Sequence, residues 1–256
     1  MSLRPSNQAQ KESPSYRLPS LDEDFILGDS QRGVRFLLEY EKAEDALRRW
    51  GVRSTVVVFG SARARPAGEP GPASGARWYQ QAREFGLIAS QRGGALDGAH
   101  GARDNVIATG GGPGVMEAAN RGAHEAGAPS IGYNISLPAE QEPNPYTTPE
   151  LTFQFHYFAM RKIHFAMRAN ALVVFPGGFG TLDELFEILT LRQTGKAPPL
   201  PVVLIDRAYW SRVIDFGAMI AEGVIECSDC ELFSHADDAE SAWAELLERG
   251  VLSMRR

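Results

Sequence analysis

Cysteines and long apolar runs are scarce in this sequence, and each shortage argues against a class of protein. The 2 cysteines among 256 residues, Cys227 and Cys230, have C-x-x-C spacing but no second pair for a zinc site, so we interpret them as ordinary thiols. No apolar run reaches the ~18 residues of a membrane helix, and residues 1–20 lack the apolar core of a signal peptide. We therefore expect no membrane association and a cytoplasmic location.

The sequence also lacks a metal-binding motif and an excess of positive charge. No set of histidines, aspartates and glutamates has the spacing of metal ligands, so we expect no metal site. Lysine and arginine together number 26 against 32 aspartates and glutamates, which gives a net charge of -6 and a sequence pI near 5.5. This balance argues against a nucleic-acid partner.

The composition fits one globular domain. With 43% hydrophobic residues the chain can form one sizeable core, and strand and helix patterns alternate without a long polar break. The first residues are polar and contain several prolines and serines. We predict a flexible N-terminal extension over residues 1–30 and a single domain over residues 31–256.

Short apolar segments rich in β-branched residues predict buried parallel strands, because they are continuous rather than alternating. These segments cover residues 54–59, 105–109, 130–135, 171–175 and 201–205. Helical patterns alternate with them over residues 31–50, 76–90, 115–126, 155–168, 182–194, 208–222 and 239–248. The alternation predicts an α/β fold, a Rossmann-like doubly wound parallel sheet with helices on both faces. Such sheets bind ligands beyond the carboxyl ends of their strands.

Glycine turns follow several of these strands, and the turn at residues 176–184 is the most informative. Glycines let the backbone approach an anion, and the free amides at a helix N-terminus attract it. None of the turns is a Walker A loop or a full dinucleotide fingerprint. The candidate phosphate-binding and substrate-binding residues in these turns are Gly177, Gly178, Phe179, Gly180 and Thr181, together with Gly111 and Gly112.

Glu184 allows two interpretations at this stage. Thr181 and Glu184 have the spacing of a capping box, in which a threonine caps the helix and the glutamate bonds back to it, stabilising the helix by about 1 kcal/mol. Alternatively, Glu184 lies one turn into the helix beside the ligand and takes part in its chemistry. The spacing does not choose between the two.

The helical segment before the fourth expected strand carries two adjacent cations among aromatic residues. Arg161 suits bidentate contact with an anion and Lys162 suits a point-charge contact. The alternative is an ion pair at the surface or at a dimer interface. Glu117 lies in the first turn after a glycine turn, where structural and ligand-binding roles are equally consistent with the sequence. We expect His156 and His164 to pack rather than to bind.

Several of these motifs, in this order, resemble the LONELY GUY (LOG) family, many members of which are labelled "possible lysine decarboxylase". The motifs are G-G-G-P-G-V-M-E-A-A-N-R-G-A, L-P-A-E-Q-E-P-N-P-Y, F-A-M-R-K and P-G-G-F-G-T-L-D-E. The resemblance covers residues 56–210 and, more loosely, the C-terminus. It implies a phosphoribohydrolase that cleaves the N-glycosidic bond of AMP or a cytokinin riboside 5′-monophosphate, releasing the base and ribose 5-phosphate. It also implies a homodimer or a larger homo-oligomer, with the site near the subunit interface.

The resemblance assigns roles to residues by their place in the motifs. Arg161 and Glu184 match the catalytic pair. Residues that match the substrate-binding part of the family site are Lys162, Gly178, Gly180, Thr181, Glu117 and Glu140. Cleavage of an N-glycosidic bond develops positive charge at C1′ of the ribose, which a carboxylate at Glu184 can stabilise while it orients the attacking water.

Other functions fit the sequence less well. Lysine decarboxylation uses a Schiff-base lysine for pyridoxal phosphate, and only Lys162 lies near the expected site, where the resemblance gives it to substrate binding. We therefore expect no cofactor. A nucleotide-binding or sensor protein without catalysis is the alternative function, but it has no need of both Arg161 and Glu184.

Overall fold

The computed structural model describes residues 5–96, 101–137 and 142–251, so the predicted site residue Glu140 lies outside the described residues. Contacts divide the chain into two units, residues 1–42 and 43–256, and the division falls within helix α3 (Arg32–Arg49). The predicted boundary at residue 30 remains a prediction. The first unit contains short helices with no buried side chain, namely α1 (Gln8–Glu12), η1 (Pro14–Tyr16), η2 (Pro19–Leu21), α2 (Glu23–Leu27) and η3 (Asp29–Gln31).

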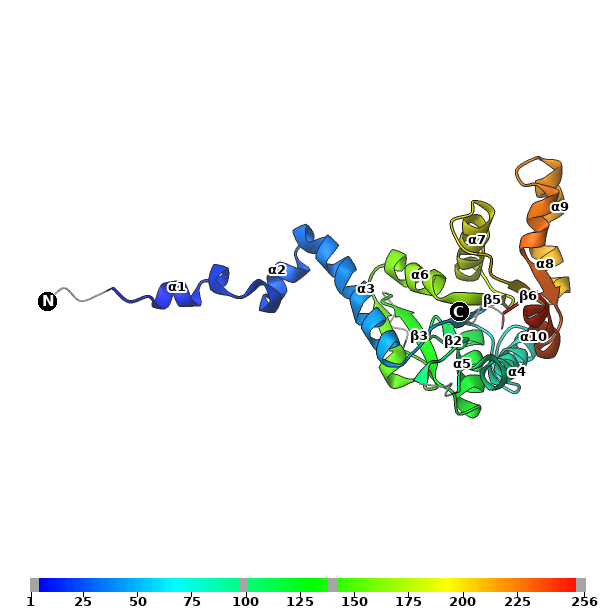
Figure 1. Cartoon of the computed structure of the whole chain (residues 1–256), viewed down its shortest axis with the longest axis horizontal. Coiled ribbons are helices and arrows are strands. Elements are labelled where there is room, and N and C mark those ends of the chain that lie inside the picture. The colour runs from blue at the N-terminus through cyan, green and yellow to red at the C-terminus, as the bar shows by residue number, and fades with distance from the viewer. Residues whose placement is uncertain (1–4, 97–100, 138–141, 252–256) are drawn as a thin grey trace. The chain divides into compact units, whose positions relative to one another are not determined.

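The second unit is built on a seven-stranded sheet in which all the strands are parallel, in the order β4-β3-β2-β1-β5-β6-β7. Figure 1 shows strands of this sheet among the surrounding helices. The strands are β1 (Thr55–Phe59), β2 (Val106–Thr109), β3 (Ser130–Ile135), β4 (Thr152–Phe155), β5 (Ala169–Val174), β6 (Val202–Ile205) and β7 (Ser234–Ala236). The strand order reverses between β1 and β5, and the carboxyl ends of strands at such a reversal are where doubly wound sheets bind ligands.

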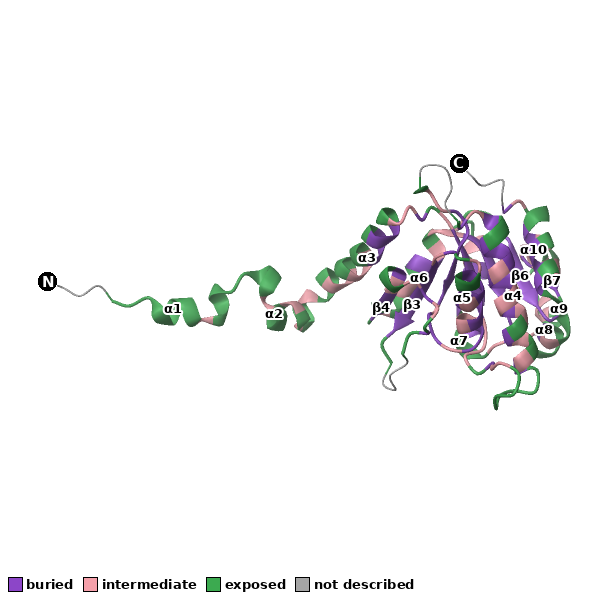
Figure 2. Cartoon of the chain, turned by 90° about the horizontal axis from the view of Figure 1, so that it is seen from below, coloured by how far each residue is buried: buried purple, intermediate pink, exposed green. Residues whose placement is uncertain are grey.

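Helices cover both faces of this sheet, as the predicted Rossmann-like fold requires. They are α4 (Gly75–Gly93), α5 (Val115–Glu125), α6 (Phe158–Met167), α7 (Phe179–Gln193), α8 (Arg207–Val213), α9 (Phe216–Ala221) and α10 (Ala239–Glu248), with the short turns η5 (Pro149–Leu151) and η6 (Cys227–Leu232). Side chains of α4, α5 and α10 form one buried cluster with the sheet, and those of α6, α7, α8 and the end of α3 form another. Figure 2 shows the buried residues concentrated in the strands and on the adjoining helix faces.

Strand β1 shows how the sequence produces this layering. All five of its residues are buried, and successive side chains point to opposite faces of the sheet. Val56 and Val58 therefore pack in one cluster, whereas Val57 and Phe59 pack in the other. A continuous apolar run is thus the expected pattern for a central parallel strand.

The predicted fold class is confirmed, but β4 and β7 were not predicted. Both lie at the edges of the sheet and include partly exposed residues, so neither has a continuous apolar run. The helix predicted over residues 155–168 begins later, because Phe155 belongs to β4. The helix predicted over residues 208–222 is divided into α8 and α9, where Asp215 accepts a hydrogen bond from the amide of Ala218 at 2.8 Å and caps α9.

Within the described ranges, no helix combines the length and the apolar character needed to cross a bilayer. The same ranges hold no group of three or more His, Cys, Asp or Glu side chains placed to share a metal ion.

A buried ion pair fixes the end of α3 against the residue that follows α6. Glu44 is 2% exposed, and its carboxylate accepts two hydrogen bonds from the Arg168 guanidinium, one of them at 2.9 Å. Burial alone would raise the pKa of Glu44, but Arg168 brings it below its ordinary value. The pair therefore stays charged inside the protein.

We expect Glu44→Gln to lower the free energy of unfolding by about 3–5 kcal/mol, because it leaves the charge of Arg168 without its buried partner. The matched control is Asp45→Asn on the same helix. Asp45 pairs with Arg49, but the two side chains are 63% and 65% exposed, so this change should cost less than ~1 kcal/mol. Urea unfolding of both variants measures the difference, and equal midpoints would contradict the role given to Glu44.

Candidate active site

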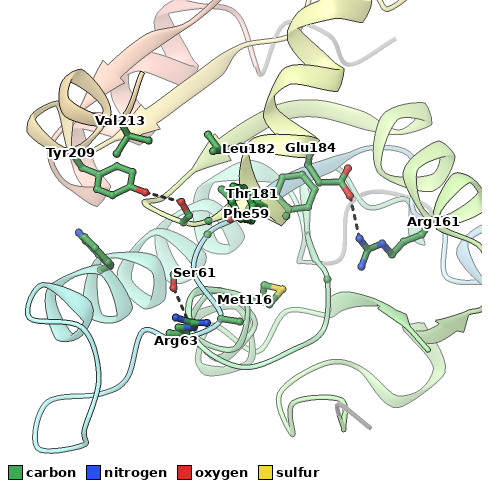
Figure 3. A pocket seen from close by; sticks show the side chains of 18 residues that line it. Phe59, Ser61, Arg63, Met116, Arg161, Thr181, Leu182, Glu184, Tyr209 and Val213 are labelled. Atoms are coloured by element: carbon green, nitrogen blue, oxygen red, sulfur yellow. Dashed lines mark hydrogen bonds and ion pairs between the residues drawn. The ribbon is translucent and has the colours of Figure 1, made fainter. Parts of the chain in front are cut away.

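A cleft of about 700 Å³ lies at the carboxyl ends of β1, β2 and β5 (Figure 3). Its walls come from the turn after β1, the N-terminus of α7, and side chains of α4, α5, α6 and α8. The lining residues are Phe59, Gly60, Ser61, Ala62, Arg63, Trp78, Gly110, Met116, Arg161, Gly177, Gly178, Phe179, Gly180, Thr181, Leu182, Glu184, Tyr209 and Val213. The cleft occupies the point where the strand order reverses, as expected for this fold.

The glycine turn after β5 forms one wall of the cleft, and we call residues 177–181 the cradle. Helix α7 begins inside it, with Gly178 as its N-cap and no side chain capping its first amides. The first amides of a helix have no acceptor within the helix and carry its positive dipole end, so they can bind an anion. The Tyr209 hydroxyl donates to the carbonyl of Gly177 at 2.6 Å and supports the cradle from α8 (Figure 3).

The capping-box interpretation of Glu184 is wrong. The helix starts at Phe179 rather than after Thr181, so Thr181 lies in its first turn and not at its N-cap. Glu184 is consequently too far along the helix to bond back to a cap. Its carboxylate instead contacts Arg161.

Glu184 and Arg161 form a buried pair in the cleft wall (Figure 3). Arg161 Nη2 donates to Glu184 Oε1 at 3.2 Å, and their side chains are only 14% and 4% exposed. Burial raises the pKa of Glu184 to about 7, although Arg161 and Lys162 act in the opposite direction. Burial likewise lowers the pKa of Arg161. A carboxylate with a pKa near neutrality in a cleft is typical of a general acid or base.

Aromatic rings hold the Arg161 guanidinium in place. Its central carbon lies 5.0 Å from the ring centre of Phe158 and 5.7 Å from that of Phe165, both on α6. These distances are within the range of cation–π attraction. The guanidinium is therefore positioned by its own helix as well as by Glu184.

Lys162 does not line the cleft. Its ammonium lies 2.8 Å from Asp183 and 2.9 Å from Glu187, both on α7. Burial would lower the pKa of Lys162, but these two carboxylates raise it. Lys162 thus connects α6 to α7 outside the cleft, and this connection fixes the distance between the helices that carry Arg161 and Glu184.

The structure also places Gly111, Gly112 and Glu117 away from the cleft wall. The turn after β2 lines the cleft through Gly110 instead. The amide of Gly111 donates to Thr109 Oγ1 at 2.9 Å, and the carbonyl of Gly112 accepts from Asn144 Nδ2 at 3.1 Å. Glu117 accepts a hydrogen bond of 2.8 Å from the hydroxyl of Tyr79. These contacts hold the turn and the start of α5 in position.

Some residues of the cleft were not identified from the sequence. They include Ser61, Arg63, Trp78, Met116, Tyr209 and Val213. The glycine turn after β1 was visible in the sequence and could have indicated Ser61 and Arg63. Trp78 and Tyr209 pack edge to face with ring centres 5.7 Å apart, but they come from distant helices and no local pattern indicates their contact.

Comparisons with known proteins identify the family of the chain. The family described as "Possible lysine decarboxylase" matches residues 116–246. A protein of Oryza sativa subsp. japonica, probable cytokinin riboside 5′-monophosphate phosphoribohydrolase LOG4, is 28% identical over 147 residues, 56% of this chain and 63% of that protein. Cytokinin riboside 5′-monophosphate phosphoribohydrolase LOG3 of Arabidopsis thaliana is 26% identical over 56% of this chain and 67% of its own length. The matched part thus spans less than two thirds of the rice relative.

A solved structure shares the fold. The X-ray structure of the structural-genomics target TM1055 aligns with a TM-score of 0.51 and 22% sequence identity. The alignment covers 76% of this chain and 99% of that chain.

We expect Gly177→Ala to destabilise the protein by about 1–3 kcal/mol, because a methyl group there would overlap the side chain of Thr181. The added carbon would lie 2.7 Å from Thr181 Cβ, closer than carbon atoms approach. Gly180→Ala is the matched control, since nothing lies near the added carbon, and alanine in a helix gains about 0.5–1 kcal/mol over glycine. Thermal unfolding measures both, and a Gly177→Ala variant as stable as Gly180→Ala would contradict this account of the cradle.

Proposed function

Because the chain belongs to the family described as possible lysine decarboxylase, with relatives named as LOG phosphoribohydrolases, we propose that it is a nucleoside 5′-monophosphate phosphoribohydrolase. In this proposal it hydrolyses the N-glycosidic bond of AMP or of a cytokinin riboside 5′-monophosphate to the free base and ribose 5-phosphate. The observation that carries the proposal is the buried pair of Glu184 and Arg161 in the same cleft as a free helix N-terminus.

The cradle supplies the site for the 5′-phosphate. Residues 177–181 line the cleft, and an anion bound there would gain from hydrogen bonds to the first amides of α7 and from the helix dipole. Glu184 lies one turn further along the same helix, so a ribose attached to that phosphate lies next to its carboxylate. Binding of the phosphate, remote from the bond that breaks, orients C1′ for reaction.

Glu184 and Arg161 then divide the chemistry. Positive charge develops at C1′ and on the ring oxygen as the base departs, and the Glu184 carboxylate stabilises it and orients or deprotonates the attacking water. Arg161 either neutralises the charge on the departing base or clamps the ribose phosphate. Its contact with Glu184 favours the ionised carboxylate that the reaction needs.

The geometry of Lys162 argues against the decarboxylase label of the family. A Schiff base needs a neutral amine in the cleft, but Lys162 is charged and engaged by Asp183 and Glu187 outside it. In the described part of the second unit the other lysine is Lys196, which is exposed and does not line the cleft. Neither Lys162 nor Lys196 is therefore placed for this chemistry.

A homodimer is part of the proposal. Helix α6 exposes Phe158, Ile163 and Met167, which are 50%, 37% and 52% exposed. Large apolar side chains gathered on one helix are typical of a protein interface. This helix also carries Arg161, so the contact would lie close to the cleft. The cytoplasmic location remains a prediction.

Release of free base from nucleoside monophosphates, followed by chromatography, tests the function. We expect adenine from AMP or N6-prenylated adenine from its nucleotide, and a loss of ~100-fold or more in Glu184→Gln, which removes the charge but keeps the size. Glu240→Gln is the matched control: Glu240 is 58% exposed, pairs with Arg92 and does not line the cleft, so turnover should stay within a few-fold. Nucleotide binding without release of any base would favour the sensor alternative instead.

The pH dependence provides a second test. The pKa of Glu184 is about 7 and its ionised form is the active one, so kcat/KM should fall as the pH drops below that value, by about tenfold per pH unit. The substrate phosphate also titrates, with a pKa of about 6. The affinity for ribose 5-phosphate over the same pH range is therefore the control. A rate profile that merely follows this affinity would contradict the assignment to Glu184.

A further inference from the structure

A second recess adjoins the cleft next to Arg161. It has a volume of about 180 Å³ and is lined by Gly110, Met116, Asn134, Ile135, Leu137, Phe158 and Arg161. Gly110, Met116 and Arg161 also line the main cleft, whereas no residue of the cradle lines the recess. The recess therefore joins the cleft at the Arg161 end and not at the phosphate end.

Asn134 is the polar side chain of this recess that the proposed mechanism leaves unused. It lies on β3, is 7% exposed, and its Nδ2 is buried with no hydrogen-bond partner among the described residues. A buried amide without a partner destabilises a protein, so such a group in a recess indicates a missing ligand. The rest of the wall is apolar apart from Arg161, so the amide and the guanidinium supply the directional contacts there.

The amide of Asn134 has room because Gly111 lies beside it. Gly111 has a φ of +69°, and a side-chain carbon there would lie 2.8 Å from Asn134 Cγ. No described hydrogen bond restrains the amide, and rotation of an asparagine amide about its last bond is soft. Either its N–H or its carbonyl can therefore be turned toward a ligand.

We propose that the recess binds the base of the nucleotide and that Asn134 recognises an adenine-type edge. This inference rests on the proposed function. An asparagine amide presents a donor and an acceptor side by side, which complements a ring nitrogen next to an exocyclic N–H. An adenine substituted once at N6 keeps such an N–H. Asn134 therefore recognises the edge of the base that carries the ring nitrogen and the N6–H, and not the ring as a whole.

The arrangement also places the reacting bond. A nucleotide with its phosphate in the cradle and its base in the recess passes the pair of Arg161 and Glu184, because Arg161 borders both spaces. Met116, Ile135 and Phe158 supply apolar contacts for the faces of the base, and the Arg161 guanidinium offers a planar surface for stacking. The N-glycosidic bond then lies between the two binding regions, beside the carboxylate.

Binding of AMP and of ribose 5-phosphate to Asn134→Leu tests the inference. Titrations use the full chain with Glu184→Gln as background, so that turnover does not consume AMP. We expect the affinity for AMP to fall about tenfold and the affinity for ribose 5-phosphate, which lacks a base, to stay unchanged. A structural defect would weaken both ligands equally, and that result, or unchanged AMP affinity, would overturn the proposal.

Purine riboside 5′-monophosphate lacks the N6 amino group and therefore tests whether Asn134 contacts that group. The protein with Asn134 should bind AMP more tightly than this analogue, and Asn134→Leu should bind the two equally. A preference that survives in Asn134→Leu would overturn the assignment of the edge to Asn134.

Further variants show whether a change in affinity comes from a general structural defect. Asn134→Asp keeps the shape but replaces the donor, and it should weaken AMP binding without affecting ribose 5-phosphate. Gln154→Leu makes the same amide-to-leucine change at the residue of β4 that pairs with Asn134, where the side chain is exposed, and should alter neither affinity. Base release from AMP by the unmodified protein is measured separately. If the unmodified protein releases base but the Asn134 variants bind AMP as tightly as it does, this inference alone is overturned. If AMP binding depends on Asn134 but no base is released, the proposed function alone is overturned.

Discussion

The structure depends on one electrostatic constraint: a carboxylate and a guanidinium are removed from water together at the carboxyl ends of the central strands of a parallel sheet. Burial disfavours the charged form of Glu184 and of Arg161, and each is the nearest compensating charge for the other. Such a pair is costly unless its geometry is held firmly. The helices that carry the two residues must therefore be fixed relative to each other, and the surrounding contacts serve this purpose.

Helical geometry explains why neighbouring residues of α6 and α7 contact different partners. Arg161 and Lys162 are neighbours on α6 and so point in directions about 100° apart, one into the cleft and the other toward α7. On α7, Asp183 and Glu187 are one turn apart and share the face that Lys162 reaches, while Glu184 turns into the cleft. The ion pairs of Lys162 stabilise the contact between α6 and α7. The pair of Arg161 and Glu184 lies in the cleft, where it is available for the proposed reaction.

Much of the fold was predictable, because central strands such as β1 are buried on both faces and therefore have continuous apolar sequences. Edge strands such as β7 lack that signal, since part of their surface is exposed. In the site, the sequence correctly indicated the glycine turn that holds the start of α7. It did not reveal that α7 starts at Phe179, that Lys162 faces away from the cleft, or that Trp78 and Tyr209 meet. These facts depend on helix register and on contacts between distant segments, neither of which is a local pattern.

The central claim is that burial in the cleft wall keeps the Glu184 carboxyl poised near neutrality. A pH titration of the side-chain carboxyl carbon by 13C NMR, with the signal assigned by its loss in Glu184→Gln, measures this directly. The account predicts a pKa of about 7. A value near 4.5, that of an ordinary glutamate, would contradict it, because the carboxyl would then be solvated and not part of a desolvated pair.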